Sequence, residues 1–164
     1  MGYPMAGWLS KQGNNVVVYN RTAMVAERWL KEYSGTAADS PTLAVANAEI
    51  IFSCLGNDSD VRDVLLAEQG ALTNMQPGSI LVDHTTTSAD LAVELAVEAA
   101  AVNCGFIDAP VSGGQQGAEN GQLTVMCGGS ADIFQQVAPV IDCYAKSVQL
   151  MGGAGSGQLC KMVN

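Results

Sequence analysis

Short runs of β-branched and other apolar residues alternate with longer segments of helical periodicity along the whole chain. This alternation is typical of a parallel sheet covered by helices, because each parallel strand needs a crossover connection before the next strand. We therefore expect one continuous sheet within a single α/β domain spanning residues 1–164. The predicted strands are Val16–Tyr19, Ile50–Ser53, Ser79–Val82, Cys104–Ile107, Leu123–Cys127 and Ser147–Leu150.

The segments between the predicted strands carry apolar residues at helical spacing. Leu91 and Leu95 follow a Thr/Ser cluster, and Val137 and Ile141 follow a serine, so we expect each polar group to cap a helix. Pro139 lies inside the second of these helices and is expected to bend or restart it.

Composition and charge exclude several classes of function. With 48% hydrophobic residues in 164, the chain can bury the core of one domain. Seven basic residues against sixteen acidic ones give a net charge of -9, which would repel a nucleic-acid backbone. No apolar run approaches the roughly 18 residues of a membrane span, and the first residues lack the basic-then-apolar order of a signal peptide. We expect neither nucleic acid nor membrane as a partner.

The cysteines indicate a reducing compartment. The five are odd in number and form no C-x-x-C pair, which favours reduced thiols and a cytoplasmic location. Four of the seven basic residues fall within the first 31 positions, where they could bind a small phosphate ligand or cover solvated helix faces. These four are Lys11, Arg21, Arg28 and Lys31.

The start of the chain is similar to the end of a G-x-G-x-x-G loop, with Gly2 as the third glycine and the first two absent. Positions 20 and 21 lie 18 and 19 residues after Gly2. At about this distance, an NAD-binding domain has an acidic residue that accepts a hydrogen bond from the ribose 2′-hydroxyl. The sequence there is Asn20-Arg21, and Arg21 can donate two hydrogen bonds to a 2′-phosphate instead. This favours NADP over NAD, and the alternative is a surface arginine that closes a turn.

A glycine-rich segment follows the fourth predicted strand, from Asp108 to Gly121. In an open parallel sheet, ligands bind beyond the carboxyl ends of the strands. Gly113 and Gly114 expose backbone N–H groups without side chains in the way, which suits a substrate carboxylate. By composition alone, the segment could equally be a loop that only turns the chain.

Five motifs in this order resemble those of the β-hydroxyacid dehydrogenases, such as 3-hydroxyisobutyrate dehydrogenases and NADP-dependent glyoxylate/succinic semialdehyde reductases. They are Met-Gly-x-x-Met-Ala, Asn-Arg-Thr, Asp-x-Thr-Thr, Asp-Ala-Pro-Val-Ser-Gly-Gly and Gly-x-Gly-x-x-x-Lys-x-x-Asn. The resemblance spans essentially the whole chain. It implies a Rossmann-like, doubly wound and mostly parallel sheet that is truncated at the first strand and lacks the C-terminal helical domain.

The resemblance also implies roles for individual residues. Lys161 corresponds to the catalytic lysine, which would protonate the carbonyl oxygen as hydride arrives, and Asn164 could orient it. Read without the family, Lys161 is a solvated charge. The cofactor would be NADP, with NAD as the alternative, and the partners would be a small carboxylate-bearing substrate and further copies of the chain. The implied cofactor contacts are Gly2, Met5, Asn20, Arg21, Thr22, Leu55 and Thr86, and the implied substrate contacts are Ser112, Gly113 and Gly114.

The departures from the family leave alternatives open. Without the Gly-x-Gly strand and the helical domain, we expect lower stability, lower cofactor affinity and impaired turnover. One alternative is a non-catalytic domain that binds a nucleotide or self-associates. Another is a 6-phosphogluconate dehydrogenase, which usually has Lys-x-x-His-Asn, whereas the histidine is missing from Lys161-Met162-Val163-Asn164.

The remaining titratable residues are interpreted as structural. His84 is the single histidine, and its neighbour Asp83 would point to the opposite face of a strand. Asp58, Asp60 and Asp63 are expected to cap a helix and interact with its dipole. No His/Cys cluster indicates a metal site.

Overall fold

The computed structural model describes all 164 residues, and its main element is a six-stranded sheet. The order is β3-β4-β5-β7-β6, and β8 also pairs with β7. Strands β3, β4 and β5 are parallel, while β7 is antiparallel to β5 and β6 and parallel to β8. The strands are β3 (Ile50–Ser53), β4 (Ile80–Asp83), β5 (Gly105–Asp108), β6 (Val111–Ser112), β7 (Leu123–Gly129) and β8 (Ala145–Gly152).

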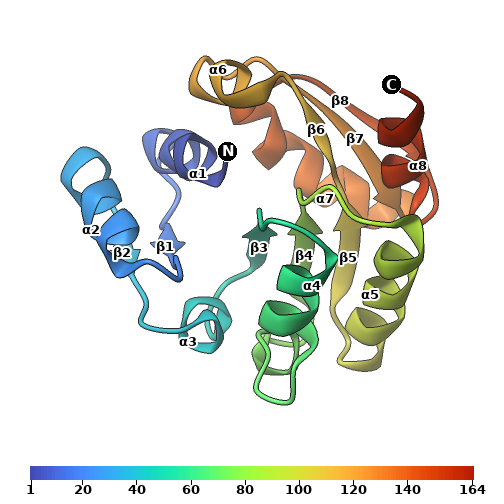
Figure 1. Ribbon diagram of the computed structural model, residues 1–164, viewed down its shortest axis with the longest axis horizontal. Helices are drawn as coiled ribbons and strands as arrows, with labels where there is room; N and C mark the ends of the chain where they lie inside the picture. Colours follow the sequence, from blue (N-terminus) through green and yellow to red (C-terminus); the bar gives the residue numbers. More distant parts are fainter.

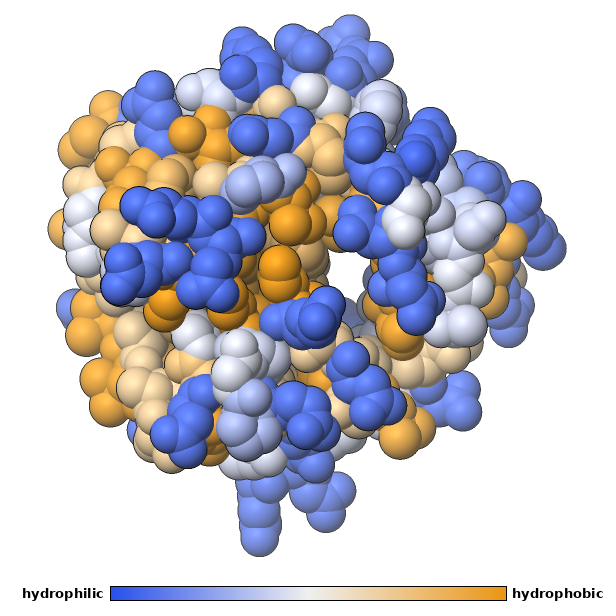
Figure 2. All heavy atoms as spheres, turned by 180° about the vertical axis from the view of Figure 1, so that it is seen from behind, coloured by the Kyte–Doolittle hydropathy of each residue, from blue (hydrophilic) through white to orange (hydrophobic).

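A second, two-stranded sheet lies apart from the first. It consists of β1 (Val17–Val18) and β2 (Thr36–Ala37), which pair in parallel. The prediction of one continuous sheet is wrong, because β1 bonds only with β2 and β3 remains an edge of the larger sheet. Figure 1 shows the pair beside α1 and α2, and Figure 2 shows an opening between this part and the larger sheet. Strands β2 and β6 were not predicted, since two residues are too few to show an alternating pattern.

Helices cover both faces of the larger sheet, as expected for a doubly wound fold (Figure 1). Along β4, Ile80 and Val82 join one buried cluster with residues of α1 and α7, whereas Leu81 joins another with residues of α4 and α5. The helices are α1 (Gly2–Lys11), α2 (Ala23–Glu32), α3 (Pro41–Val45), α4 (Asp58–Val61), α5 (Ala89–Ala101), α6 (Gly114–Glu119), α7 (Ala131–Ile141) and α8 (Ser156–Val163). The chain also has a π-helix, η1 (Arg62–Leu66), and two 3-10 helices, η2 (Leu72–Asn74) and η3 (Asp142–Tyr144).

The predicted serine caps are confirmed at both helices. Ser88 Oγ accepts a hydrogen bond from Leu91 N at 3.2 Å, and Ser130 Oγ accepts one from Ile133 N at 3.3 Å. Helix α7 runs through Pro139 as one helix, so the expected alternative of a restart is wrong. Because Pro139 lies in the last turn, it removes one backbone donor without interrupting the body of the helix.

Helix α1 connects the two sheets. Its Trp8 indole donates to Ala118 O at 3.0 Å on one side, and the Trp29 indole of α2 donates to Tyr3 O at 3.2 Å on the other. A Cβ at Gly7 would lie 2.4 Å from the Tyr33 ring, so a glycine is needed for this close contact. The position of the small sheet therefore depends on α1. None of the helices is long and apolar enough to cross a membrane.

Candidate functional site

The loops after β3 and β4 and the segment from β6 to the start of α6 meet Met1, which precedes α1, and the body of α8 around one cavity of about 290 Å³. The cavity lies at the carboxyl edge of the parallel strands, where ligands bind in open α/β sheets. It is lined by Met1, Cys54, Leu55, Gly56, His84, Thr85, Thr86, Val111, Ser112, Gly113, Gly114 and Lys161.

Thr86 is presented to this cavity by a rigid loop. Its side chain is exposed, while Thr85 and Thr87 on either side are buried. Thr85 Oγ1 donates to Asp83 Oδ1 at 2.6 Å and accepts from Leu55 N at 3.0 Å, which ties the loop after β4 to the loop after β3. The loop can therefore hold Thr86 at a fixed place beside a ligand.

The second wall is the glycine pair after β6. Gly113 and Gly114 have φ angles of 131° and 62°, a region that favours glycine, and a Cβ at Gly114 would meet nothing within 4 Å. Strand β6 fixes the start of this loop, because Ser112 pairs with Thr124 of β7. The open backbone at Gly114 leaves room for a small acid in the cavity.

Lys161 lines the same cavity from α8. The two ion pairs of the structure join Arg21 to Asp60 and Arg62 to Glu94, so the Lys161 ammonium has no carboxylate partner. A cationic donor in a cavity with an open backbone wall can transfer a proton to a bound oxygen.

Arg21 lies outside the cavity, in the loop between β1 and α2. The Arg21 side chain is 89% exposed, and its Nη1 is 3.8 Å from Asp60 Oδ1 on α4. Asn20 Oδ1 accepts from Thr22 N at 2.9 Å, which fixes the turn. This contact places the loop after β1 beside α4, which follows the loop after β3.

Several of the expected site residues come together, and others do not. Leu55, Thr86, Ser112, Gly113, Gly114 and Lys161 all line the cavity. Gly2 packs against Cys54, where a Cβ would lie 3.3 Å from the cysteine Cβ, so the N-terminus of α1 faces the same edge. Met5 is instead 3% exposed in the core, and Asn164 is exposed just beyond the end of α8. Thr22 begins α2 beside the Arg21 loop.

The acidic residues at the start of α4 do not cap the helix, as had been expected, and two of them contact other elements. Asn57 caps the helix, accepting from Asp60 N at 3.0 Å. Asp58 accepts from the backbone N and hydroxyl of Ser88, and Asp60 pairs with Arg21. The expected capping role is therefore wrong, because Asn57 already fills the cap position, whereas the expected place beside the helix dipole is confirmed for Asp58 and Asp60 in the first turn of α4 and for Asp63 in the first turn of η1.

Two buried polar residues, Asp108 and Gln158, were not identified as functional from the sequence. Asp108 is the last residue of β5 and begins the glycine-rich segment, whereas Gln158 belongs to α8. Both side chains are 0% exposed. A single buried glutamine forms no repeating pattern in a sequence. The motifs around Gln158 were therefore the only features that could point to it.

His84 has the structural role that was expected, at the floor of the cavity. Its Nδ1 donates to Ala109 O at 2.7 Å, and its Nε2 accepts from the Tyr144 hydroxyl at 2.8 Å. These roles follow because a carbonyl oxygen only accepts. The ring stacks on Phe52 at 5.8 Å. Burial lowers the pKa of the His84 imidazole to about 4.

This depressed pKa predicts a loss of stability in acid. The unfolded chain protonates His84 near its ordinary pKa of 6.5, whereas the folded chain resists protonation down to about 4. The His84 contribution is therefore complete above about pH 6.5 and falls by about 3 kcal/mol as the pH drops to 4. Urea unfolding of the wild type and of His84→Gln is measured between pH 7 and 4.5. The difference in unfolding free energy between the two proteins should become smaller as the pH falls.

The comparison with the variant is needed because two buried carboxyls act in the opposite direction. Burial raises the pKa of Asp83 and of Asp108, so acidification favours their folded, protonated forms. A constant difference between wild type and His84→Gln across this pH range would contradict the assignment of a neutral buried imidazole.

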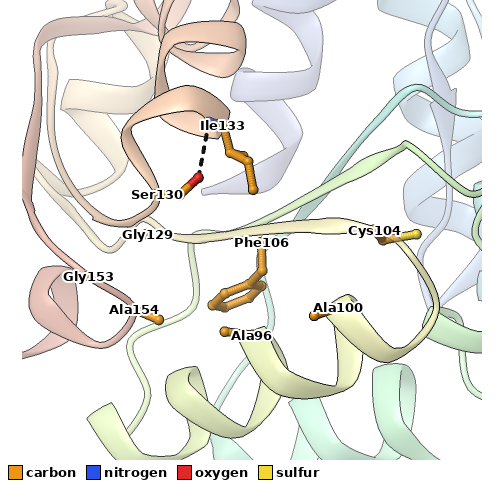
Figure 3. A pocket seen from close by; sticks show the side chains of 9 residues that line it. All are labelled: Ala96, Ala100, Cys104, Phe106, Gly129, Ser130, Ile133, Gly153 and Ala154. Carbon is orange, nitrogen blue, oxygen red and sulfur yellow. Dashed lines mark hydrogen bonds between the residues drawn. The ribbon is translucent and has the colours of Figure 1, made fainter.

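A larger cavity of about 360 Å³ lies elsewhere, where β5 and β7 separate. Figure 3 shows Phe106 directed toward α5 and Ile133 coming from α7 on the other side of the strand. Six of its nine lining residues are hydrophobic, and none is acidic or basic. It lacks the groups for acid–base chemistry, so the polar cavity is the candidate site.

The chain is similar in sequence to known oxidoreductase domains. Residues 1–153 match the family model for the NAD binding domain of 6-phosphogluconate dehydrogenase. All of the chain aligns at 54% identity with 56% of an uncharacterized oxidoreductase of Shewanella frigidimarina. It also aligns at 41% identity with 49% of the probable mitochondrial 3-hydroxyisobutyrate dehydrogenase-like protein 1 of Arabidopsis thaliana.

The fold has close counterparts among solved structures. The Mycobacterium tuberculosis 3-hydroxyisobutyrate dehydrogenase with L-serine superposes with a TM-score of 0.93 at 29% identity, covering all of this chain and 55% of that one. The chain spans about half the length of the curated relatives that it matches. This likeness covers both sheets and the loops that form the cavity.

Proposed function

The chain belongs to the family of the NAD binding domain of 6-phosphogluconate dehydrogenase, and on this premise we propose that it serves an NADP-dependent dehydrogenase of small 3-hydroxyacids or semialdehydes. The observation that carries the proposal is one cavity lined by Thr86, the Gly113–Gly114 backbone and the unpaired Lys161. The hydroxyacid branch is favoured by the relatives and by Asn164 following Lys161 without an intervening histidine.

The residues present fit a nicotinamide dinucleotide. The N-terminus of α1 lies at Cys54, where its free N–H groups and dipole favour a pyrophosphate. Exposed Thr86 is available beside the nicotinamide, and the Arg21 loop lies at the other end of the cleft. When bound, the dinucleotide would supply or accept hydride at the substrate carbon.

The preference for NADP rests on Arg21. Its guanidinium is 89% exposed and can turn toward a 2′-phosphate, to which it would donate paired hydrogen bonds. An enzyme specific for NAD would instead place a carboxylate at this point to accept the ribose hydroxyl. Here the corresponding side chains are Asn20 and Arg21.

The substrate would lie between the glycine loop and α8. Ser112, Gly113 and Gly114 would bind its carboxylate through hydroxyl and backbone N–H donors. In the reducing direction, Lys161 would give its proton to the carbonyl oxygen as the carbon receives hydride, leaving a neutral amine that solvent reprotonates. In the oxidising direction, the neutral amine would remove the hydroxyl proton.

The test uses the full-length protein, meaning one that carries this chain and has the length of its relatives. Consumption of NADPH is followed with succinic semialdehyde, glyoxylate and tartronate semialdehyde, each against NADH. We expect turnover of at least one substrate with NADPH preferred. No turnover with any of them, by a folded protein, would contradict the proposal.

Asp60 is expected to weaken NADP binding, because a 2′-phosphate must displace it from Arg21. The pair is exposed and long, so its removal should matter modestly. In Asp60→Asn, we expect the Kd for NADPH to fall by about two- to fivefold and the Kd for NADH to change by less than about 1.5-fold. Fluorescence titration measures both. Asp63→Asn is the matched control, since Asp63 is exposed, lies two residues beyond α4 and has no ion partner. An equal gain for NADPH and NADH would contradict the competition.

A further inference from the structure

We propose that Gln158 is a positioning residue that holds Thr86 and Lys161 at a fixed separation across the cavity. The proposal rests on the function above and assigns to the buried side of the cavity a role in the reaction.

Gln158 clamps both sides of Thr86. Its Nε2 donates to Thr85 O at 2.8 Å, and its Oε1 accepts from Thr87 N at 3.1 Å. The glutamine is 0% exposed, so water does not compete for these bonds. The backbone is therefore fixed immediately before and after Thr86, while the Thr86 side chain stays free to contact a ligand.

The other end of the link is the anchoring of α8. Asp108 at the end of β5 accepts from Gly155 N at 2.7 Å and from Gln158 N at 3.0 Å. A Cβ at Gly157 would lie 2.3 Å from Met126 O, so α8 packs directly on the β7 backbone. Lys161 follows Gln158 by three residues on this anchored helix. One side chain thus joins the helix that carries the lysine to the loop that carries the threonine.

Gln158 is the one side chain of α8 that forms hydrogen bonds with residues 85–87. The connection requires a donor toward Thr85 O and an acceptor toward Thr87 N, which an amide combines in one planar group. The nearby Thr87 hydroxyl is buried and has no hydrogen-bond partner, so it does not tie the loop to α8. Gln158→Glu would replace the donor with an oxygen facing an oxygen, and Gln158→Leu would leave both backbone groups unpaired.

The test measures kcat, the substrate KM, the Kd for NADPH and the Tm of both variants in the full-length protein. The assays are run well below each Tm, so that all proteins are folded. Because small misplacements of reacting groups slow catalysis strongly, we expect kcat to fall about 10- to 100-fold, with KM and Kd within about threefold of wild type. Gln135→Leu and Gln135→Glu on the exposed face of α7 are the matched controls.

Two further readouts separate positioning from a merely structural role. Protonation of the introduced carboxyl restores the missing donor, so kcat of Gln158→Glu relative to wild type should rise as the pH falls, whereas that of Gln158→Leu should not. Acetic anhydride labelling, followed by mass spectrometry, should show the Lys161 acylation rate changed more than about threefold in both variants and unchanged in the controls.

The outcomes distinguish this proposal from the proposed function. If the folded variants keep wild-type kcat and Lys161 labelling and lose only Tm, Gln158 is structural and the inference is wrong. If the wild type itself has no turnover, the proposed function fails, and the labelling of Lys161 then decides the positioning alone: an unchanged rate overturns it, and a changed rate supports it.

Discussion

Lys161→Ala in the full-length protein is expected to lower kcat by about 10²- to 10⁴-fold, the range over which a positioned proton donor contributes. The Kd for NADPH should stay within about twofold, because Lys161 faces the substrate side of the cavity beside Ser112, Gly113 and Gly114. The physical reason is that no other cationic side chain lines the cavity, and His84 at its floor is neutral, with both ring nitrogens occupied. Steady-state assays with NADPH and fluorescence titration measure the two quantities.

Lys146→Ala is the control for this result, since Lys146 is exposed on β8. It should leave kcat unchanged. A Lys161→Ala enzyme with wild-type kcat, or one that loses cofactor affinity as strongly as turnover, would show that the proton comes from another group.

Arg21→Ala should raise the Kd for NADPH by about 10- to 100-fold, because charge-assisted hydrogen bonds are each worth about 1.5 to 3 kcal/mol. NADH has no 2′-phosphate for the guanidinium to bind, so its Kd should change by less than about threefold. Titrations of both cofactors against one protein preparation measure the ratio directly.

Arg28→Ala is the matched control for Arg21, since Arg28 is also exposed and lies over the Tyr3 ring at 4.8 Å. It should shift neither affinity by more than about twofold. Equal losses for NADPH and NADH in Arg21→Ala would mean that Arg21 supports the cleft without reading the phosphate.

Much of the fold could be predicted because its strands are buried and its helices are capped. Ile50–Ser53 is predicted without error, and Leu123–Gly129 differs only at its end, since both runs are long enough to show an apolar pattern. Ser88 and Ser130 mark the starts of α5 and α7 by ordinary cap chemistry. The separate pairing of β1 with β2 could not be predicted, because pairing depends on contacts between distant segments.

The candidate site was predictable where it depends on backbone chemistry. The adjacent glycines indicated an open wall, and the structure has both at positive φ. Gln158 and the Arg21–Asp60 pair were missed for one reason. Each joins a helix to a loop that is far away in the sequence. Neither a buried amide nor an exposed ion pair produces a periodic pattern of residues in the sequence. The family motif suggested that Met5 contacts the cofactor. This stays a prediction, and the Met5 side chain lies in the core.

The central claim is that one dinucleotide spans the cleft from the loop after β1 to the cavity beneath α8. A crystal structure of the full-length protein with NADP⁺ tests it most directly. We expect the 2′-phosphate within about 3 Å of the Arg21 guanidinium and the nicotinamide beside Thr86, on the side facing Lys161. A dinucleotide bound elsewhere, or one whose nicotinamide lies away from Thr86 and Lys161, would contradict it.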